Sequence, residues 1–261
     1  DIAIRVDCDK IAYDSCVSRG AKSIMPPTVT EDVNGSFGKS TIQTYGDTVH
    51  SFICRKNYSG LWAPGFKRLN MPKIKSNIPN LIKIDHIVGN VEVHKMDFWK
   101  EYYENIFGFS TFVKFDEDDI STEYSSLKSV VVRSKNWKVK LPINEPAEGL
   151  KKSQIEEYLD SNEGPGVQHI AILTDDIVDA IEKLRLNGVD FLDVPDSYYD
   201  DLSKRIGDVD EDIEKLKKLK ILVDRDEEGY LLQLFTKPLQ DRPTLFIEII
   251  QRKGSRGFGQ G

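Results

Sequence analysis

Two histidines, His86 and His169, lie in two copies of one local pattern. Residues 84–88 (IDHIV) and 167–171 (VQHIA) are short apolar segments of strand type, and each is soon followed by a helical segment. A lone histidine is more often a hydrogen-bonded core residue than a ligand. Because the repeat places these two histidines at equivalent points on equivalent strands, the pattern favours two ligands of one site.

A buried carboxylate supplies the third member of this set. Glu248 stands in the apolar segment 245–250 (LFIEII), and burying an unpaired carboxylate is so costly that a metal ion is an obvious partner. Two histidines and one glutamate from three different strands are the facial ligand set of non-heme ferrous oxygenases. Their wide spacing excludes a zinc finger, whose ligands cluster in short loops. We therefore predict that His86, His169 and Glu248 bind Fe(II) and leave three adjacent positions open for substrate and dioxygen.

The two remaining histidines lack such a context. His50 stands in the middle of an expected strand and His94 at the start of an expected helix. We interpret both as structural or solvent-facing residues.

The composition is that of a globular protein with a small ligand. The chain has 261 residues, 39% of them hydrophobic and 10% aromatic, and a formal net charge of -7. No basic cluster could replace phosphate counterions, which argues against nucleic acid or an anionic membrane as the main partner. No apolar run approaches the roughly 20 residues needed to cross a bilayer, and no signal peptide opens the chain. Three sparse cysteines fit a reducing cytoplasm, and they are Cys8, Cys16 and Cys54.

An internal repeat sets the expected architecture. With an offset of 168, residues 1–4 (DIAI) align with 169–172 (HIAI), and Ala12 aligns with Ala180. A third copy begins near residue 84. Asp1 takes the place of His169 in the first copy, so we expect that copy to be a scaffold without metal.

Each copy reads as a strand, a helix and up to three further strands. The later strands are expected at 40–45, 49–55, 124–133, 137–141, 220–224, 230–235 and 244–251, and the middle helix at 94–107. The fold class is therefore α+β, with repeated βαβββ units that form half-open mixed β-barrels with flanking helices. We expect residues 1–66 to be the second unit of a truncated N-terminal domain. Residues 67–261 would be a C-terminal catalytic domain of two units, 82–150 and 164–252, without a final closing helix.

Three stretches interrupt the repeat. Residues 57–80, rich in Gly, Pro and Lys, read as an inter-domain linker. Residues 144–163 connect the last two units through a helix expected at 152–159. Residues 195–219 read as a charged insertion that ends in an amphipathic helix at 210–219, and we assign this insertion to solvent and the sheet edge.

Long segments of the chain carry a family resemblance. The matching stretches, in one order over nearly the whole chain, are 42–50, 55–58, 85–86, 141–146, 152–155, 166–171, 229–238 and 241–252. On these stretches the chain resembles the 4-hydroxyphenylpyruvate dioxygenase family, of the vicinal oxygen chelate superfamily. Members of that family carry a preceding unit and continue past the turn at 257–259 into a closing helix.

The resemblance implies site residues beside the Fe(II) ligands. It implies a pocket with polar residues Ser129, Asn144, Gln154, Gln168 and Gln233 and with aromatic walls Phe235, Phe246 and Phe258. Among these, Asn144, Gln168 and Gln233 are expected to take part in the reaction. The plainer alternatives are a strand role for Ser129, a turn role for Asn144 and a core role for Phe246.

The resemblance also implies an activity. This activity is the oxidation of 4-hydroxyphenylpyruvate by O2 to homogentisate and CO2, in tyrosine and phenylalanine catabolism, by a cytoplasmic homo-oligomer, a dimer or tetramer. A close alternative is 4-hydroxymandelate synthase, but the bulky Phe235 favours hydroxylation of the ring. A non-catalytic binding protein of the same superfamily would lack the iron ligands, and a glyoxalase-type zinc or nickel isomerase would normally need four protein ligands.

Overall fold

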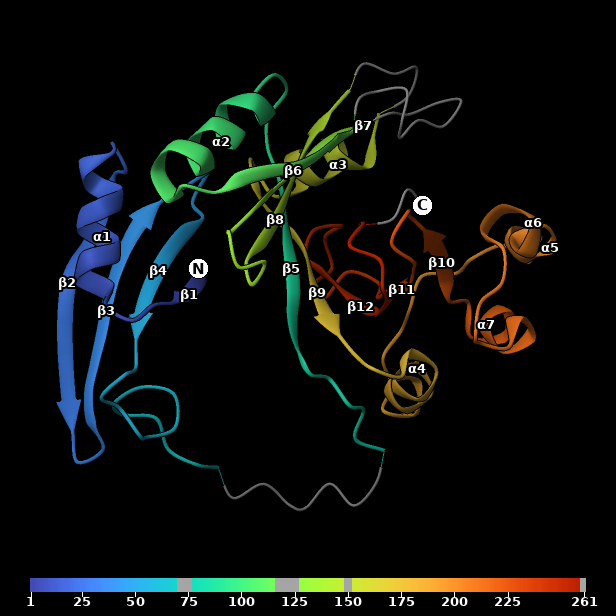
Figure 1. Ribbon diagram of the computed structural model, residues 1–261, viewed down its shortest axis with the longest axis horizontal. Coiled ribbons are helices and arrows are strands. Elements are labelled where there is room, and N and C mark those ends of the chain that lie inside the picture. The colour runs from blue at the N-terminus through green and yellow to red at the C-terminus, as the bar shows by residue number, and fades with distance from the viewer. Residues whose placement is uncertain (70–76, 116–126, 148–151, 259–261) are drawn as a thin grey trace.

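The computed structural model describes residues 1–69, 77–115, 127–147 and 152–258, and these residues form two β-sheets with flanking helices (Figure 1). One sheet has four strands and the other has eight. Among the helices of these residues, none is long and apolar enough to cross a membrane.

The smaller sheet contains residues from the first copy of the repeat. Its strands are β1 (Ile2–Arg5), β2 (Ser23–Asp32), β3 (Gly35–Gln43) and β4 (Val49–Cys54), in the order β1-β4-β3-β2. The helix α1 (Asp9–Ser18) covers one face. Its residues Tyr13 and Cys16 are buried in one cluster with Ile42 and Phe52 of the sheet.

The larger sheet is built from two similar halves. Its order is β10-β11-β12-β9-β5-β8-β7-β6, so each half pairs its first strand in parallel with its last. The two first strands pair antiparallel at the centre of the sheet. The strands are β5 (Lys83–Asn90), β6 (Ser110–Phe115), β7 (Leu127–Arg133), β8 (Lys140–Pro146), β9 (Gly166–Leu173), β10 (Leu222–Arg225), β11 (Tyr230–Phe235) and β12 (Phe246–Lys253). This arrangement confirms the predicted fold class.

The sequence pattern did not predict the strands β2 and β6, and it placed β8 several residues too early. The edge strand β2 is mostly exposed and contains Pro26 and Pro27, so it shows no alternation of apolar and polar residues. The edge strand β6 was also missed. The strand expected at 137–141 lies instead at 140–146, because Trp137 has a positive φ of 60° in the preceding turn.

The prediction that the insertion at 195–219 lies in solvent and at the sheet edge is wrong, because part of this segment is buried in the core. It forms α5 (Ser197–Asp200), α6 (Leu202–Ile206) and α7 (Ile213–Leu219), which gather with α4 (Ile177–Leu186) near β10 (Figure 1). Leu202 and Leu216 are fully buried in one cluster with Ile181 of α4 and Leu232 of the sheet. The apolar residues that join the core stand singly among many charged residues, so the sequence pattern did not indicate their burial.

The remaining helices lie near their predicted places. The segment 94–107 forms α2 (Met96–Tyr102), which continues as a π-helical turn, η1 (Tyr103–Phe107). The helix α3 (Gln154–Ser161) begins with a capping box, in which Ser153 and Glu156 exchange hydrogen bonds.

Candidate metal centre

His86, His169 and Glu248 converge from three adjacent strands. In the register, Ala171 on β9 lies opposite His86 on β5 and opposite Glu248 on β12, and the pairing of β5 with β9 places Val88 opposite His169. The Oε2 atom of Glu248 lies 3.1 Å from Nε2 of His86 and 3.1 Å from Nε2 of His169. One potential ligand atom from each residue lies within 4.8 Å of the other two.

The chemistry of this group fits a divalent metal ion. Glu248 is 1% exposed, and its Oε1 atom has no hydrogen-bond partner among the residues that the structure describes. An orphaned buried carboxylate oxygen is destabilising unless a cation neutralises it. Two imidazole nitrogens and a carboxylate form the donor set of facial-triad metal sites.

Burial and the charges of the neighbouring side chains shift the pKa values of all three residues. Burial opposes ionisation of Glu248, but His86 and His169 outweigh it and lower the pKa of Glu248 to about 2. Burial also acts to lower the pKa of His86, yet the carboxylates of Glu248 and Asp85 raise it above its usual value. Burial lowers the pKa of His169, although Glu248 partly compensates. The carboxylate therefore stays ionised, as a metal ligand requires.

Each histidine is held at its other ring nitrogen by the residue that precedes it. Nδ1 of His86 donates to Oδ2 of Asp85 at 2.8 Å, and Nδ1 of His169 donates to Oε1 of Gln168 at 2.9 Å. Both acceptors fix the tautomer that leaves Nε2 free to bind a metal. Sequence reasoning assigned no role to Asp85. The repeat could have indicated this role, because a residue with a hydrogen-bond acceptor precedes the histidine in both copies, Asp85 in one and Gln168 in the other.

Aromatic rings surround the two imidazoles. The ring of Phe246 stacks on His169 with centroids 4.9 Å apart, and Phe235 meets the same histidine edge-on at 5.8 Å. The ring of Phe258 meets His86 edge-on at 4.9 Å. The three predicted wall residues therefore all lie beside the candidate ligands.

The predicted polar residues are more widely distributed. Ser129 on β7 lies directly opposite Asn144 on β8, and both are buried. Gln168 contacts His169, as described above. Gln154 is exposed as the first residue of α3, so the structure does not bring it into the buried group.

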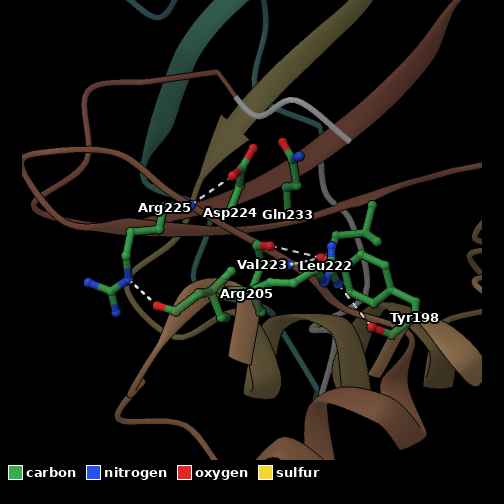
Figure 2. A pocket seen from close by; sticks show the side chains of 8 residues that line it. Tyr198, Arg205, Leu222, Val223, Asp224, Arg225 and Gln233 are labelled. Atoms are coloured by element: carbon green, nitrogen blue, oxygen red, sulfur yellow. Dashed lines mark hydrogen bonds between the residues drawn. The ribbon is translucent and has the colours of Figure 1, made fainter. Parts of the chain in front are cut away.

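Gln233 lies near the opposite edge of the sheet. It is 2% exposed, and in the described part of the chain its Oε1 atom has no hydrogen-bond partner. Gln233 lies opposite Ile250 in the β11–β12 register, two positions from the pair formed by Phe235 and Glu248. It also lines a cavity of about 380 Å³ beside β10. In Figure 2 its side chain and that of Asp224 project to the same side from neighbouring strands.

Comparisons with known proteins point to one family. The sequence profile of the Glyoxalase/Bleomycin resistance protein/Dioxygenase superfamily matches residues 83–234. A 4-hydroxyphenylpyruvate dioxygenase of Yarrowia lipolytica is 49% identical over 269 residues, which cover 100% of this chain and 68% of that protein. The corresponding enzyme of Coccidioides posadasii is 48% identical, with coverage of 100% and 67%.

A solved structure has a similar fold. A mutant of 4-hydroxymandelate synthase from Streptomyces coelicolor superimposes with a TM-score of 0.84 at 30% identity, and the match covers 99% of this chain and 73% of that one. The identity to the dioxygenases is considerably higher and extends over the whole chain. The chain therefore belongs to the 4-hydroxyphenylpyruvate dioxygenase family, a family of enzymes within the glyoxalase and dioxygenase superfamily.

Proposed function

We propose that the protein is an Fe(II)-dependent dioxygenase that converts 4-hydroxyphenylpyruvate and O2 to homogentisate and CO2. The observation that carries the proposal is the convergence of His86, His169 and Glu248, which each bring one potential ligand atom within 4.8 Å of the other two, with both Nε2 atoms 3.1 Å from Oε2 of Glu248. Membership in a family of this name supports the substrate and the reaction.

The three side chains would hold Fe(II) and leave one face of the ion open. Bound Fe(II) would orient the keto acid and would supply the redox chemistry toward O2 that these side chains lack. Glu248 and two neutral imidazoles give the centre a net charge of about +1, which attracts an anionic keto acid.

The side chains around the centre would orient the substrate. Phe235 and Phe246 beside His169, and Phe258 beside His86, form apolar walls that restrict the aromatic ring. We assign the binding of polar groups on the substrate to Asn144 and Gln233, which are both buried. Gln168 would act mainly by orienting His169, and Ser129 by supporting Asn144 across the strand pair.

Ring hydroxylation and side-chain hydroxylation distinguish the two candidate activities. The similarity to 4-hydroxymandelate synthase makes that enzyme the second candidate. We favour homogentisate because Phe235 places a large ring next to His169, where it would hold the substrate ring in reach of oxidation. Chromatographic identification of the product separates the two.

Domain division, location and assembly are part of the same proposal. We propose that residues 1–66 belong to an N-terminal domain and residues 67–261 to the catalytic domain, with units at 82–150 and 164–252. The three free cysteines support a reducing cytoplasm. A dimer or tetramer is the expected assembly, and light scattering of the purified protein tests it.

The decisive experiment loads the purified protein with Fe(II) under anaerobic conditions and then adds 4-hydroxyphenylpyruvate and oxygen. We expect homogentisate and CO2. Glu248→Ala should lose iron and turnover together, whereas Glu182→Ala, at an exposed position of α4, should keep both. Full turnover by the Glu248→Ala variant would reject the ligand assignment.

A further inference from the structure

Arg252 of β12 holds the carboxylate that orients His86. Its Nε donates to Oδ1 of Asp85 at 3.1 Å, and its Nη2 donates to Oδ2 of the same carboxylate at 2.8 Å. Such a two-point contact fixes both the position and the plane of the carboxylate. Asp85 in turn accepts from Nδ1 of His86, so the guanidinium group acts on a candidate metal ligand through one intermediate residue.

The surroundings of Asp85 leave it little freedom. The residue is 5% exposed, and Lys140 of β8 also donates to its Oδ1 at 2.9 Å. The side chains of Arg252 and Lys140 are themselves only 14% and 13% exposed. A carboxylate with three charged or imidazole donors is strongly stabilised in one orientation.

The same guanidinium group also holds the turn that carries Phe258. Its Nη1 donates to the backbone carbonyl oxygens of Ser255 at 3.3 Å and of Gly257 at 2.6 Å. Its central carbon lies 5.4 Å from the centre of the Phe258 ring, within the range of a cation–π contact. Arg252 therefore contacts the turn and the carboxylate beside His86 at once.

A second residue, Asp226, also anchors the turn. Oδ2 of Asp226 accepts from the backbone N–H groups of Arg256 at 3.0 Å and of Gly257 at 2.8 Å, and from the hydroxyl of Ser255. Oδ1 of Asp226 accepts from the backbone N–H groups of Glu228 and Gly229. Within the described residues, Asp226 has no hydrogen bond to Asp85 or to the two histidines. The turn thus has two anchors, of which Arg252 alone also holds the carboxylate at His86.

We infer that Arg252 is a positioning residue that acts at two places of the site: it orients the metal ligand His86 through Asp85, and it seats the turn at 255–258. It holds Asp85 so that Nε2 of His86 faces the metal, and it holds the turn so that Phe258 packs against the same imidazole. Loss of Arg252 therefore weakens metal binding and loosens one wall of the substrate pocket together. This inference rests on the proposed metal centre.

The test is a Co(II) titration of the purified protein, followed by the visible absorption of the bound ion. Co(II) reports both affinity and ligand geometry, independently of turnover. Outer-shell partners of metal-binding histidines typically change affinity by about 10- to 100-fold. We expect Arg252→Met to bind Co(II) more weakly by about this factor and to shift the absorption band, and Arg252→Lys to recover part of both changes.

Asp226→Asn is the matched control, because Asp226 anchors the same turn but, within the described residues, has no hydrogen bond to Asp85 or to the candidate metal ligands. We expect this variant to keep the Co(II) affinity and band of the wild type and, with Fe(II), to raise the KM for 4-hydroxyphenylpyruvate. An Arg252→Met protein with wild-type Co(II) affinity and an unchanged band would overturn the inference. An equal loss of affinity in Asp226→Asn would also overturn it, since the turn alone would then explain the effect.

Two further variants distinguish a failure of this inference from unfolding of the protein and from failure of the proposed metal centre. If circular dichroism shows that Arg252→Met is unfolded, Asp85→Asn tests the same contact, because its amide oxygen can still accept from His86 but its charge pair with Arg252 is gone. Glu248→Ala separates this inference from the proposed function. If Glu248→Ala binds Co(II) like the wild type, the metal centre itself is wrong. If Glu248→Ala loses Co(II) while Arg252→Met keeps the affinity and band of the wild type, the metal centre stands and only the role of Arg252 is wrong.

Discussion

Nε2 of His50 lies 2.7 Å from the hydroxyl oxygen of Tyr103, and this hydrogen bond joins β4 of the smaller sheet to η1, the turn that continues α2. Nδ1 of His50 donates to the carbonyl oxygen of Ile2 at 3.2 Å, so Nε2 must accept the proton of the tyrosine hydroxyl. The same hydroxyl can accept from Thr44 at 3.1 Å. A neutral imidazole satisfies this network, whereas an imidazolium ion would donate from Nε2 as well and would reverse the hydrogen bond to Tyr103.

This network predicts a loss of stability in acid. Burial lowers the pKa of His50 to about 4 in the folded protein, against 6.5 in the unfolded chain. Between these values the unfolded state binds more protons, so the contribution of His50 to the free energy of unfolding is complete above pH 6.5. It decreases as the pH falls toward 4, by about 3 kcal/mol in all.

Urea denaturation from pH 7 to pH 4 measures this effect. Because other groups titrate in the same range, the informative quantity is the difference between the wild type and His50→Gln. We expect that difference to shrink as the pH falls. Parallel stability curves for the two proteins would contradict the assignment of a neutral, buried His50.

The charged insertion predicts a second result. Leu216 of α7 is fully buried in the cluster that includes Ile181 and Leu232, so Leu216→Ala leaves a cavity in the main core. We expect a loss of about 2–5 kcal/mol in the free energy of unfolding. Leu186→Ala on α4, 71% exposed, should change it by less than about 0.5 kcal/mol. Equal, small effects in urea denaturation would mean that the insertion is peripheral.

The candidate metal ligands could be predicted because each left a local signal. His86 and His169 repeat one pattern, and Glu248 is a charge inside an apolar strand. The central strands were predictable for the same reason, since they are apolar and regularly spaced. The edge strand β2 gave no such signal, because an exposed strand with Pro26 and Pro27 resembles a loop.

The contacts that support the site could not be predicted, because they depend on strand register. Asp85 meets Lys140 and Arg252 only because β8 and β12 lie on either side of the β5–β9 pair. Nothing in the spacing of these three residues along the chain indicates their proximity. The burial of α6 and α7 was missed for a related reason, since their apolar residues are isolated among charges and gain a common partner only in the folded core.

In each half of the larger sheet, a side chain of the last strand accepts a hydrogen bond from the first turn of a helix, and this contact should contribute to stability. Oε1 of Gln251 on β12 accepts the backbone N–H of Ile177 at 2.8 Å at the start of α4, and Oε2 of Glu145 on β8 accepts the N–H of Met96 at 2.9 Å at the start of α2. Gln251→Leu would leave the N–H of Ile177 buried and unpaired. We expect a loss of about 1–3 kcal/mol in the free energy of unfolding.

Hydrogen exchange and denaturation together check this cap. The amide of Ile177 should exchange faster in Gln251→Leu, whereas Gln251→Glu, which keeps a side-chain acceptor, should retain most of its protection. If the leucine variant protects this amide as well as the wild type does, the cap is not what stabilises the start of α4.

Phe235 provides the test of product choice within the proposed function. Its ring lies edge-on to His169 at 5.8 Å and edge-on to Phe246 at 5.8 Å, so it fills the space next to the proposed iron. Phe235→Val replaces this ring by a small isopropyl group and allows the aromatic ring of the substrate to move away from the reactive centre. The side chain of the substrate then competes with the ring for oxidation. We expect the share of homogentisate to fall and 4-hydroxymandelate to appear, while iron binding by His86, His169 and Glu248 is retained.

Chromatography of the products, with iron content measured on the same sample, checks both expectations. Phe98→Val, at an exposed position of α2, is the control and should leave the product ratio unchanged. A Phe235→Val enzyme that still forms only homogentisate would show that other residues hold the substrate ring in place.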